Sequence, residues 1–202
     1  MVTDKGGVAM DLPIKIETKR LVLKGLNEPS FELAKNIYRV VDSTRDSLRE
    51  WLPWVDKTHT PEDEYTHYLV EWCQKHWDNK EGFAYIIIDK ETDGLIGCVD
   101  IFNISEKNKS AEIGYWLAQS ATGKGYMKEA VLALEKEAFQ QDINRIIIRN
   151  DTRNLPSAHV AKRCGYVLEG VMRQNSWSEF HQDLYDTNIW AKIKSDWMRQ
   201  KE

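Results

Sequence analysis

The run "TGKGYM", residues 122–127, contains residue types that could bind an anion. It lies between a strand-like run, "EIGYWL", and a helix-like run, "YMKEAVLALEKEAF". Glycine at 123 and 125 would let the backbone turn tightly or let another group approach it closely. The first N–H groups of a helix have no partner within the helix and carry about half a positive charge. We therefore expect the loop amides to form a site for an anion such as a pyrophosphate.

Two better-known phosphate motifs do not fit this loop. A P-loop needs Ser or Thr after its lysine to hold magnesium, but Gly125 follows Lys124, and Ala118 stands where the first glycine should be. A dinucleotide-binding fingerprint needs a third glycine three residues after Gly125, where the chain has Lys128. Taken alone, the loop is equally consistent with an ordinary strand-to-helix turn.

A second polar pair, Asn154 and Ser157, begins another predicted helix, "LPSAHVAKR". Either side chain could cap that helix and still face a ligand. We interpret His159, in the same helix, as an ordinary helix-face residue. The histidines show no zinc-binding spacing such as His-Glu-x-x-His. No metal is therefore expected.

The segments before residue 80 predict one strand and three helices. Residues 20–26 alternate as a strand, and an amphipathic helix with Pro29 at its start follows it. A short helix after residue 42 is expected to stop at Pro53. A third helix should begin with Thr60 as its N-cap and Pro61 in its first turn.

Residues 82–118 are typical of three consecutive antiparallel strands, joined by a turn at Asp93 and Gly94 and by the polar run "SEKNKS". After them we expect, in order, a helix over 125–140, a buried strand over 143–150, a helix over 155–163, and a hairpin of two strands, 166–177 and 181–193, that finishes the chain. This order predicts an α+β fold: a single domain with a mixed, mostly antiparallel twisted sheet flanked by helices.

Composition favours a single cytoplasmic domain. The 202 residues suit one domain, which we place at 12–198 behind a flexible tail at 1–11. The net charge of -4 is spread along the chain, so binding to nucleic acid or a membrane is not expected. Three widely spaced cysteines, Cys73, Cys98 and Cys164, are expected to be buried free thiols in a reducing compartment. No segment has the roughly 20 apolar residues of a membrane span, and the first residues lack a leader pattern.

Several of these motifs occur in the order found in a known family. The strand, glycine loop and helix, "AEIGYWLAQSATGKGYMKEA", precede "NLPSAHVAKRCGY", which in turn precedes "EGVMRQ" and "HQDLYD". Over residues 15–195 the chain resembles the GNAT superfamily of N-acetyltransferases, and within it the RimJ/RimL branch of ribosomal-protein N-terminal acetyltransferases. The resemblance implies the GNAT fold, with a central strand pair that splays apart, and acetyl-CoA as the cosubstrate.

The resemblance also implies where acetyl-CoA lies. The strand over 113–117 would diverge from the strand over 145–149, and the pantetheine arm would occupy the gap. The residues implied to contact this arm are Tyr115, Trp116 and Leu117, through backbone groups left unpaired by the gap, and Asn154. The residues implied to hold the pyrophosphate are Thr122, Gly123, Lys124, Gly125 and Tyr126. One departure is Ser120, where many superfamily members, though often not this branch, have Gln or Arg.

Acetyl transfer needs a neutral amine, an acceptor for its proton and a donor for the departing thiolate. An α-amine, with a pKa of about 8, loses its proton more readily than a lysine at about 10.4. In the family the acid that matches Glu112 faces the acceptor and could take this proton through water; the alternative is a solvated edge carboxylate. Many members use a Tyr as acid where this chain has Ala161. Ser157 resembles the RimL-like substitute that would hydrogen-bond the sulfur.

The acceptor would be bound by residues before and within the three strands. "WLPW", with Trp51 and Trp54, resembles a RimL-branch signature at the peptide entrance, with aromatic core packing as an equal alternative. Phe102 and Asn103, on the strand beside Glu112, are further candidates.

Three functions remain open from the sequence. The leading hypothesis is acetyl transfer from acetyl-CoA to the N-terminal α-amine of a protein, such as a ribosomal protein. The alternatives are a small amine acceptor, such as an aminoacyl nucleotide or an antibiotic, and a non-catalytic CoA-binding module. RimL-like relatives commonly form homodimers, so a homodimer through the two late strands is expected.

Overall fold

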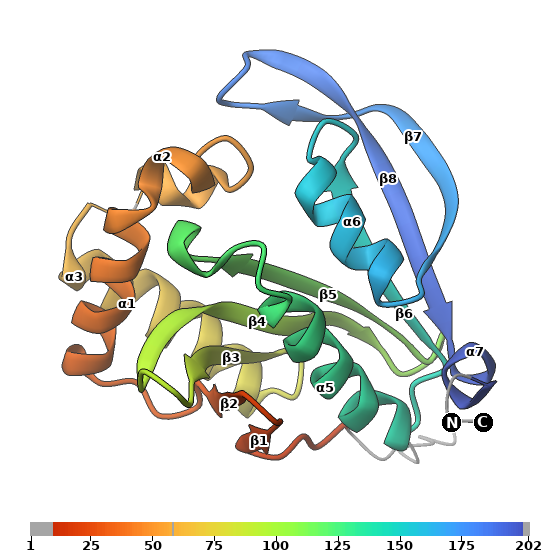
Figure 1. The fold of residues 1–202 in the computed structure, drawn as a ribbon, viewed down its shortest axis with the longest axis horizontal. Helices are drawn as coiled ribbons and strands as arrows, with labels where there is room; N and C mark the ends of the chain where they lie inside the picture. Colours follow the sequence, from red (N-terminus) through yellow and green to blue (C-terminus); the bar gives the residue numbers. More distant parts are fainter. Residues whose placement is uncertain (1–9, 58, 200–202) are drawn as a thin grey trace, which may run out of the picture.

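A twisted eight-stranded sheet forms the centre of the molecule (Figure 1) in the computed structural model, which describes residues 10–57 and 59–199. The strands follow the order β1-β2-β3-β4-β5-β6-β8-β7 across the sheet. Their bounds are β1 (Lys15–Glu17), β2 (Leu21–Gly25), β3 (Phe83–Asp89), β4 (Gly94–Ser105), β5 (Ser110–Leu117), β6 (Arg145–Asp151), β7 (Val167–Ser178) and β8 (Asp183–Ile193). Only β5 and β6 run parallel among these neighbours. The predicted α+β class with a mixed, mostly antiparallel sheet is confirmed.

Helices cover both faces of this sheet. They are α1 (Phe31–Ser43), α2 (Arg45–Leu48), η1 (Pro53–Lys57), α3 (Pro61–Asp63), η2 (Glu64–Gln74), α4 (Lys75–Asp78), η3 (Gln119–Ala121), α5 (Tyr126–Gln140), α6 (Leu155–Arg163) and α7 (Lys194–Arg199). Apolar residues of α5 and α6 pack on one face, and those of α1 and η2 pack on the other. The three cysteines are buried and unpaired, as predicted. No helix in the described part of the chain is long and apolar enough to cross a membrane.

Local signals place several of these helices correctly. Thr60 caps α3 by accepting from the amide of Asp63, whose carboxylate accepts from the Thr60 amide in return. Pro61 occupies the first turn, where its missing N–H costs nothing. At α6, the Asn154 side chain caps the helix as expected. The predicted bounds of α6 are confirmed.

Four features differ from the sequence prediction. Strand β1 was not predicted, because three residues are too few to show an alternating pattern. Helix α7 was not predicted either, since the hairpin was expected to finish the chain. The second helix ends at Leu48 rather than at Pro53, where the 3-10 turn η1 begins. The third helix widens into a π-helix over η2, which buries Glu64 completely.

The described residues begin at Met10, within the segment predicted to be a tail. Residues 1–9 of the predicted tail fall outside the described residues. Met10 and Leu12 pack in the apolar cluster beneath α5, together with Ile16 of β1. The packed structure therefore includes Met10.

Strands β5 and β6 pair for only part of their length. Ser110, Ala111 and Glu112 pair with Arg145, Ile146 and Ile147, and the remainder of β5 has no register with β6. Beyond Glu112 the two strands diverge, which confirms the predicted splayed pair. This divergence leaves backbone N–H and C=O groups of β5 without a strand partner on that side, and it opens the sheet toward the loop that precedes α5.

Candidate active site

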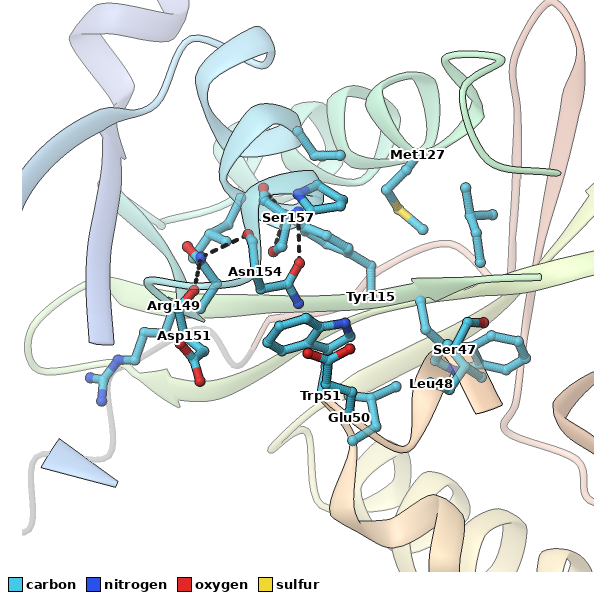
Figure 2. Close-up of a pocket in the computed structure, with 18 of the residues that line it drawn as sticks. Ser47, Leu48, Glu50, Trp51, Tyr115, Met127, Arg149, Asp151, Asn154 and Ser157 are labelled. Atoms are coloured by element: carbon cyan, nitrogen blue, oxygen red, sulfur yellow. Dashed lines mark hydrogen bonds between the residues drawn. The ribbon is translucent and has the colours of Figure 1, made fainter. Parts of the chain in front are cut away.

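A cavity of about 930 Å³ lies where β5 and β6 diverge. Its walls come from the segment 47–53, β5, the loop before α5, β6, α6 and the tip of the β7–β8 hairpin. Figure 2 shows Trp51 and Glu50 on one side of this space, and Asn154 and Ser157 on the other, with Tyr115 between them. The cavity thus joins segments that are far apart in the sequence.

Ten of the predicted site residues line this cavity: Trp51, Tyr115, Trp116, Leu117, Thr122, Gly123, Gly125, Tyr126, Asn154 and Ser157. Five others, which the structure also describes, lie outside its lining: Trp54, Phe102, Asn103, Glu112 and Lys124. His159, which we interpreted as an ordinary helix-face residue, also lines the cavity. Most of the cofactor-binding prediction therefore converges on one space, whereas the acceptor prediction is divided.

The glycine loop has the backbone conformation that requires glycine. Gly123 has φ 75° and Gly125 has φ 77°, which L side chains adopt only with strain. A Cβ on Gly123 would meet no atom within 4 Å, so the conformation rather than crowding explains the residue. Helix α5 begins directly after Gly125 with Tyr126. The loop therefore presents a helix N-terminus at the wide end of the β5–β6 opening.

Arg20 fixes this loop from the start of β2. Its Nη1 donates to the Lys124 carbonyl at 2.9 Å, and its Nε donates to Glu129 of α5 at 2.7 Å. The guanidinium also lies 4.5 Å above the Tyr126 ring, whose hydroxyl donates to Asp89 at 3.0 Å. Arg20 was missed by the sequence analysis, because its partners lie more than a hundred residues away and no local pattern links them.

Two cations near the loop were also missed. Lys128, in the first turn of α5, and Arg163, at the end of α6, both line the cavity. Cationic side chains beside a helix N-terminus favour binding of phosphate groups. Lys128 could have been predicted as a phosphate contact, because it closely follows the glycine loop in the sequence. No local pattern connects Arg163 with that loop.

Ser157 is held at three atoms. Its amide donates to Asn154 Oδ1 at 3.0 Å, which is the helix cap. The Tyr115 hydroxyl donates to the Ser157 carbonyl at 3.1 Å and lies 3.2 Å from Ser157 Oγ (Figure 2). Burial raises the pKa of Tyr115 well above its usual range. Ala161, at the position where many family members have Tyr, is buried and supplies no polar group.

Glu112 lies at the last paired position of β5, just before the strands diverge. Its Oε2 accepts from Asn103 Nδ2 at 3.2 Å and lies 3.5 Å from Arg149 Nε, and Arg149 lines the cavity. A β-bulge between Phe102 and Ser105 places Asn103 at φ 50°, a conformation that Asn tolerates better than most residues. Asn103 therefore contacts the Glu112 carboxylate, and the cavity borders on Glu112 through Arg149.

A second carboxyl group lies next to Glu112 on the same face of the sheet. Asp100 pairs with Gly114 in the register between β4 and β5, and desolvation raises the pKa of Asp100 to about 7. A Cβ on Gly114 would lie 2.6 Å from Asp100 Oδ1, so glycine there leaves room for the carboxyl group. Tyr115 points to the opposite face of β5 from Glu112, because side chains alternate along a strand.

The aromatic residues predicted for the acceptor divide into two groups. Trp51 lines the cavity, and its ring centroid lies 6.3 Å from that of His181 in the β7–β8 hairpin. Next to it, Glu50 Oε1 lies 3.2 Å from His181 Nε2, so the two walls touch there. Trp54 and Phe102 instead pack in an aromatic row with Tyr68 and Trp72. Trp54 also packs against the apolar core that includes α1 and η2, whereas Phe102 is half-buried against Trp72.

Among residues 10–57 and 59–199, no group of three or more His, Cys, Asp or Glu side chains could hold a metal ion.

Comparisons with known proteins agree with this geometry. The family model for the acetyltransferase (GNAT) domain matches residues 20–167. The chain is 32% identical over 161 residues to the ribosomal-protein-serine acetyltransferase of Escherichia coli (strain K12), covering 79% of this chain and 86% of that protein. The RimL ribosomal L7/L12 alpha-N-protein acetyltransferase, solved in complex with coenzyme A, has a TM-score of 0.78 at 26% identity, covering 90% of this chain and 97% of that one.

A third relative is named for self-immunity to microcin C7 and not for a ribosomal protein. The microcin C7 self-immunity acetyltransferase MccE, solved in complex with acetyl-CoA and AMP, has a TM-score of 0.80 at 25% identity, covering 92% of this chain and 99% of that one. The family model spans the glycine loop, the diverging strands and the Asn154–Ser157 helix start. The chain therefore belongs to the GNAT family of acetyltransferases.

Proposed function

We propose that the protein transfers the acetyl group of acetyl-CoA to the N-terminal α-amine of a protein, with a ribosomal protein as the preferred class of acceptor. The observation that carries this proposal is the opening between β5 and β6, which leads from Ser157 to a helix N-terminus with two positive-φ glycines. Acetyl-CoA has a matching shape, because its long amide-containing arm can lie in the opening while its pyrophosphate lies at the helix N-terminus.

The residues present fit acetyl-CoA along its length. The unpaired backbone of β5 at Tyr115 and Leu117 would pair with the amides of the pantetheine arm. The loop amides from Thr122 to Tyr126 would hold the pyrophosphate, with Lys128 as a nearby cation. The thioester would then lie near Ser157, on the wall opposite Trp51 (Figure 2).

The transfer itself needs the two substrates held in position, a group that accepts the amine proton and a group that donates a hydrogen bond to the departing sulfur. The neutral α-amine attacks the thioester carbonyl carbon, so that a C–N bond forms and the C–S bond breaks. Glu112, which borders the cavity through Arg149, would accept the amine proton through a water. The Ser157 hydroxyl would donate to the departing sulfur, and the thiolate takes up a proton to leave as CoA.

The acceptor class rests on the relatives and on the low pKa of an α-amine. Two of the three relatives described above are named for ribosomal proteins, and one is named for an N-terminal amine. An α-amine also requires the weaker base, since its pKa of about 8 lies well below that of lysine. Because ribosomal proteins are made in the cytoplasm, we place the protein there.

The test is release of CoA thiol by the purified protein over a panel of acceptors. The panel holds short peptides with free N-termini, the same peptides with acetylated N-termini and an internal lysine, aminoacyl nucleotides and polyamines. Turnover with the free N-termini alone supports the proposal. Turnover with the small amines alone would replace the acceptor class, and acetyl-CoA binding without turnover on any amine would indicate a binding module.

We also propose that the protein forms a homodimer through β7. This strand is an edge of the sheet, and it exposes Val167, Val171 and Met172 along its length. An exposed apolar edge strand readily pairs with another strand, and an equivalent strand of a second copy satisfies both its apolar side chains and its free backbone groups. Sedimentation equilibrium should give twice the chain mass, and Val171→Lys should shift it to the monomer. A monomer mass for the parent protein would refute this assembly.

A further inference from the structure

We propose that Tyr115 is a positioning residue for departure of the thiolate: its hydroxyl holds Ser157 Oγ so that the serine proton faces the sulfur of CoA. This inference rests on the proposed function, because it takes the β5–β6 opening as the place of the pantetheine arm. It assigns the Tyr115 side chain a role of its own, in addition to the backbone of that residue.

The geometry places the phenol between the two walls of the opening. Tyr115 extends from β5 to the first turn of α6, where its oxygen lies 3.1 Å from the Ser157 carbonyl and 3.2 Å from Ser157 Oγ (Figure 2). Both Tyr115 and Ser157 line the cavity. The cap bond from the Ser157 amide to Asn154 fixes the other side of the serine. The hydroxyl of Ser157 is therefore confined between the phenol and the cavity.

Counting protons gives two arrangements of this pair. A phenol has one proton and can also accept. In the first arrangement, the Tyr115 hydroxyl donates to the Ser157 carbonyl, which can only accept, and the phenol oxygen can accept the Ser157 proton. When negative charge develops on the sulfur, the phenol proton can turn to Ser157 Oγ, and the serine proton then points to the sulfur. No proton leaves either oxygen in this exchange, so the pair strengthens a hydrogen bond without changing its own charge.

The surroundings of Tyr115 favour this exchange over full proton transfer. Burial raises the pKa of the phenol, so it keeps its proton through the working pH range. The helix position from which many family members present a tyrosine holds the buried side chain of Ala161. Tyr115 therefore brings a phenol to the same region from the opposite wall, and it acts through Ser157 rather than directly on the substrate.

The test combines Tyr115→Phe, Ser157→Ala and the double variant with two measurements. Tyr38→Phe is the matched control, because the Tyr38 hydroxyl also donates to a backbone carbonyl, that of His59, at 2.8 Å but lies outside the cavity lining. The first measurement is kcat and KM for acetyl-CoA. The second is the pKa of the thiol of bound CoA, followed by the ultraviolet absorbance of its thiolate, which requires no acceptor.

Tyr115→Phe should lower kcat by about fivefold to tenfold, the size of one neutral hydrogen bond, and leave KM for acetyl-CoA unchanged. Ser157→Ala should lower kcat about tenfold to a hundredfold, and the double variant should be no slower than Ser157→Ala. Both single variants should raise the thiol pKa of bound CoA, and Tyr38→Phe should change nothing. Multiplying losses in the double variant, or an unchanged thiol pKa in Tyr115→Phe, would overturn the inference.

The two measurements separate this inference from the proposed function. If CoA binds and its thiol titrates as expected, but no peptide is acetylated, the role of Tyr115 stands and the acceptor proposal fails. If peptides are acetylated and the thiol titration is the same in all variants, only the role of Tyr115 fails. Absence of CoA binding in the parent protein would overturn both.

Discussion

Replacement of Glu112 by Gln should change how the rate depends on pH more than it changes the fold. The side chain is 13% exposed and accepts from Asn103 at 3.2 Å, and a glutamine oxygen of the same size can accept that bond. The contact with Arg149 at 3.5 Å is partly solvated, so its loss should cost less than about 1 kcal/mol. The variant should therefore fold and bind acetyl-CoA like the parent protein.

The rate loss should be about a hundredfold at pH 7, the lower end of general base catalysis, because the proton passes through a water. An α-amine with a pKa of about 8 is roughly 10% neutral at pH 7 and roughly 90% neutral at pH 9. The rate of Glu112→Gln, relative to that of the parent protein at the same pH, should therefore rise about tenfold between pH 7 and pH 9. The relative rate of Ser157→Ala should stay constant over this range. The assay is the initial rate of CoA release at saturating acetyl-CoA. A variant whose pH profile has the shape of the parent's would show that Glu112 is not the base.

Three further predictions concern the loop and the buried charges. Gly125→Asp should weaken acetyl-CoA binding, because it forces a positive φ on a side chain and adds a carboxylate at the anion site; equal affinity by calorimetry would contradict this assignment. Burial raises the pKa of Glu64 to about 7, so the folded state keeps this proton while the unfolded state loses it near pH 4.3, and stability should fall by about 3 kcal/mol between these values. In urea unfolding, the advantage of Glu64→Gln over the parent should grow from pH 5 to pH 8, and a constant difference would refute it. Lys192 Nζ lies 2.7 Å from Glu135 in the core. Lys192→Met should therefore lower the free energy of unfolding by about 3 to 5 kcal/mol, because it leaves the Glu135 carboxylate buried and unpaired. Adding Glu135→Leu should recover most of this loss, and a double variant no more stable than Lys192→Met would contradict the explanation.

The parts of the fold that the sequence predicted well are those with strong local signals. Thr60 and Pro61 mark a helix start through cap chemistry that involves only neighbouring residues. The glycines at 123 and 125 were expected to allow an unusual backbone, and both have positive φ. The divergence of β5 and β6 was implied by the family resemblance, because neither strand shows in its own composition where pairing with the other ends.

The parts that could not be predicted depend on contacts between distant segments. Arg20 follows a lysine at the start of a strand, and only the folded structure places it against Lys124 and Glu129. Glu64 belongs to a run of acids that normally faces solvent at a helix start, yet the π-helix η2 turns it into the core. The tyrosine at 115 was expected to act through its backbone, since the reach of its hydroxyl depends on how far β5 lies from α6.

Position of the acetyl group on one peptide tests the central claim most directly. The peptide carries a free N-terminal serine and one internal lysine, and it is incubated at pH 7 with acetyl-CoA and the protein, with Gly125→Asp as the control for cofactor binding. Tandem mass spectrometry then locates the product. The account predicts acetyl on the N-terminal α-amine, little on the lysine, and much less product with the variant. Acetylation of the lysine in preference to the α-amine, or equal product from both proteins, would contradict it.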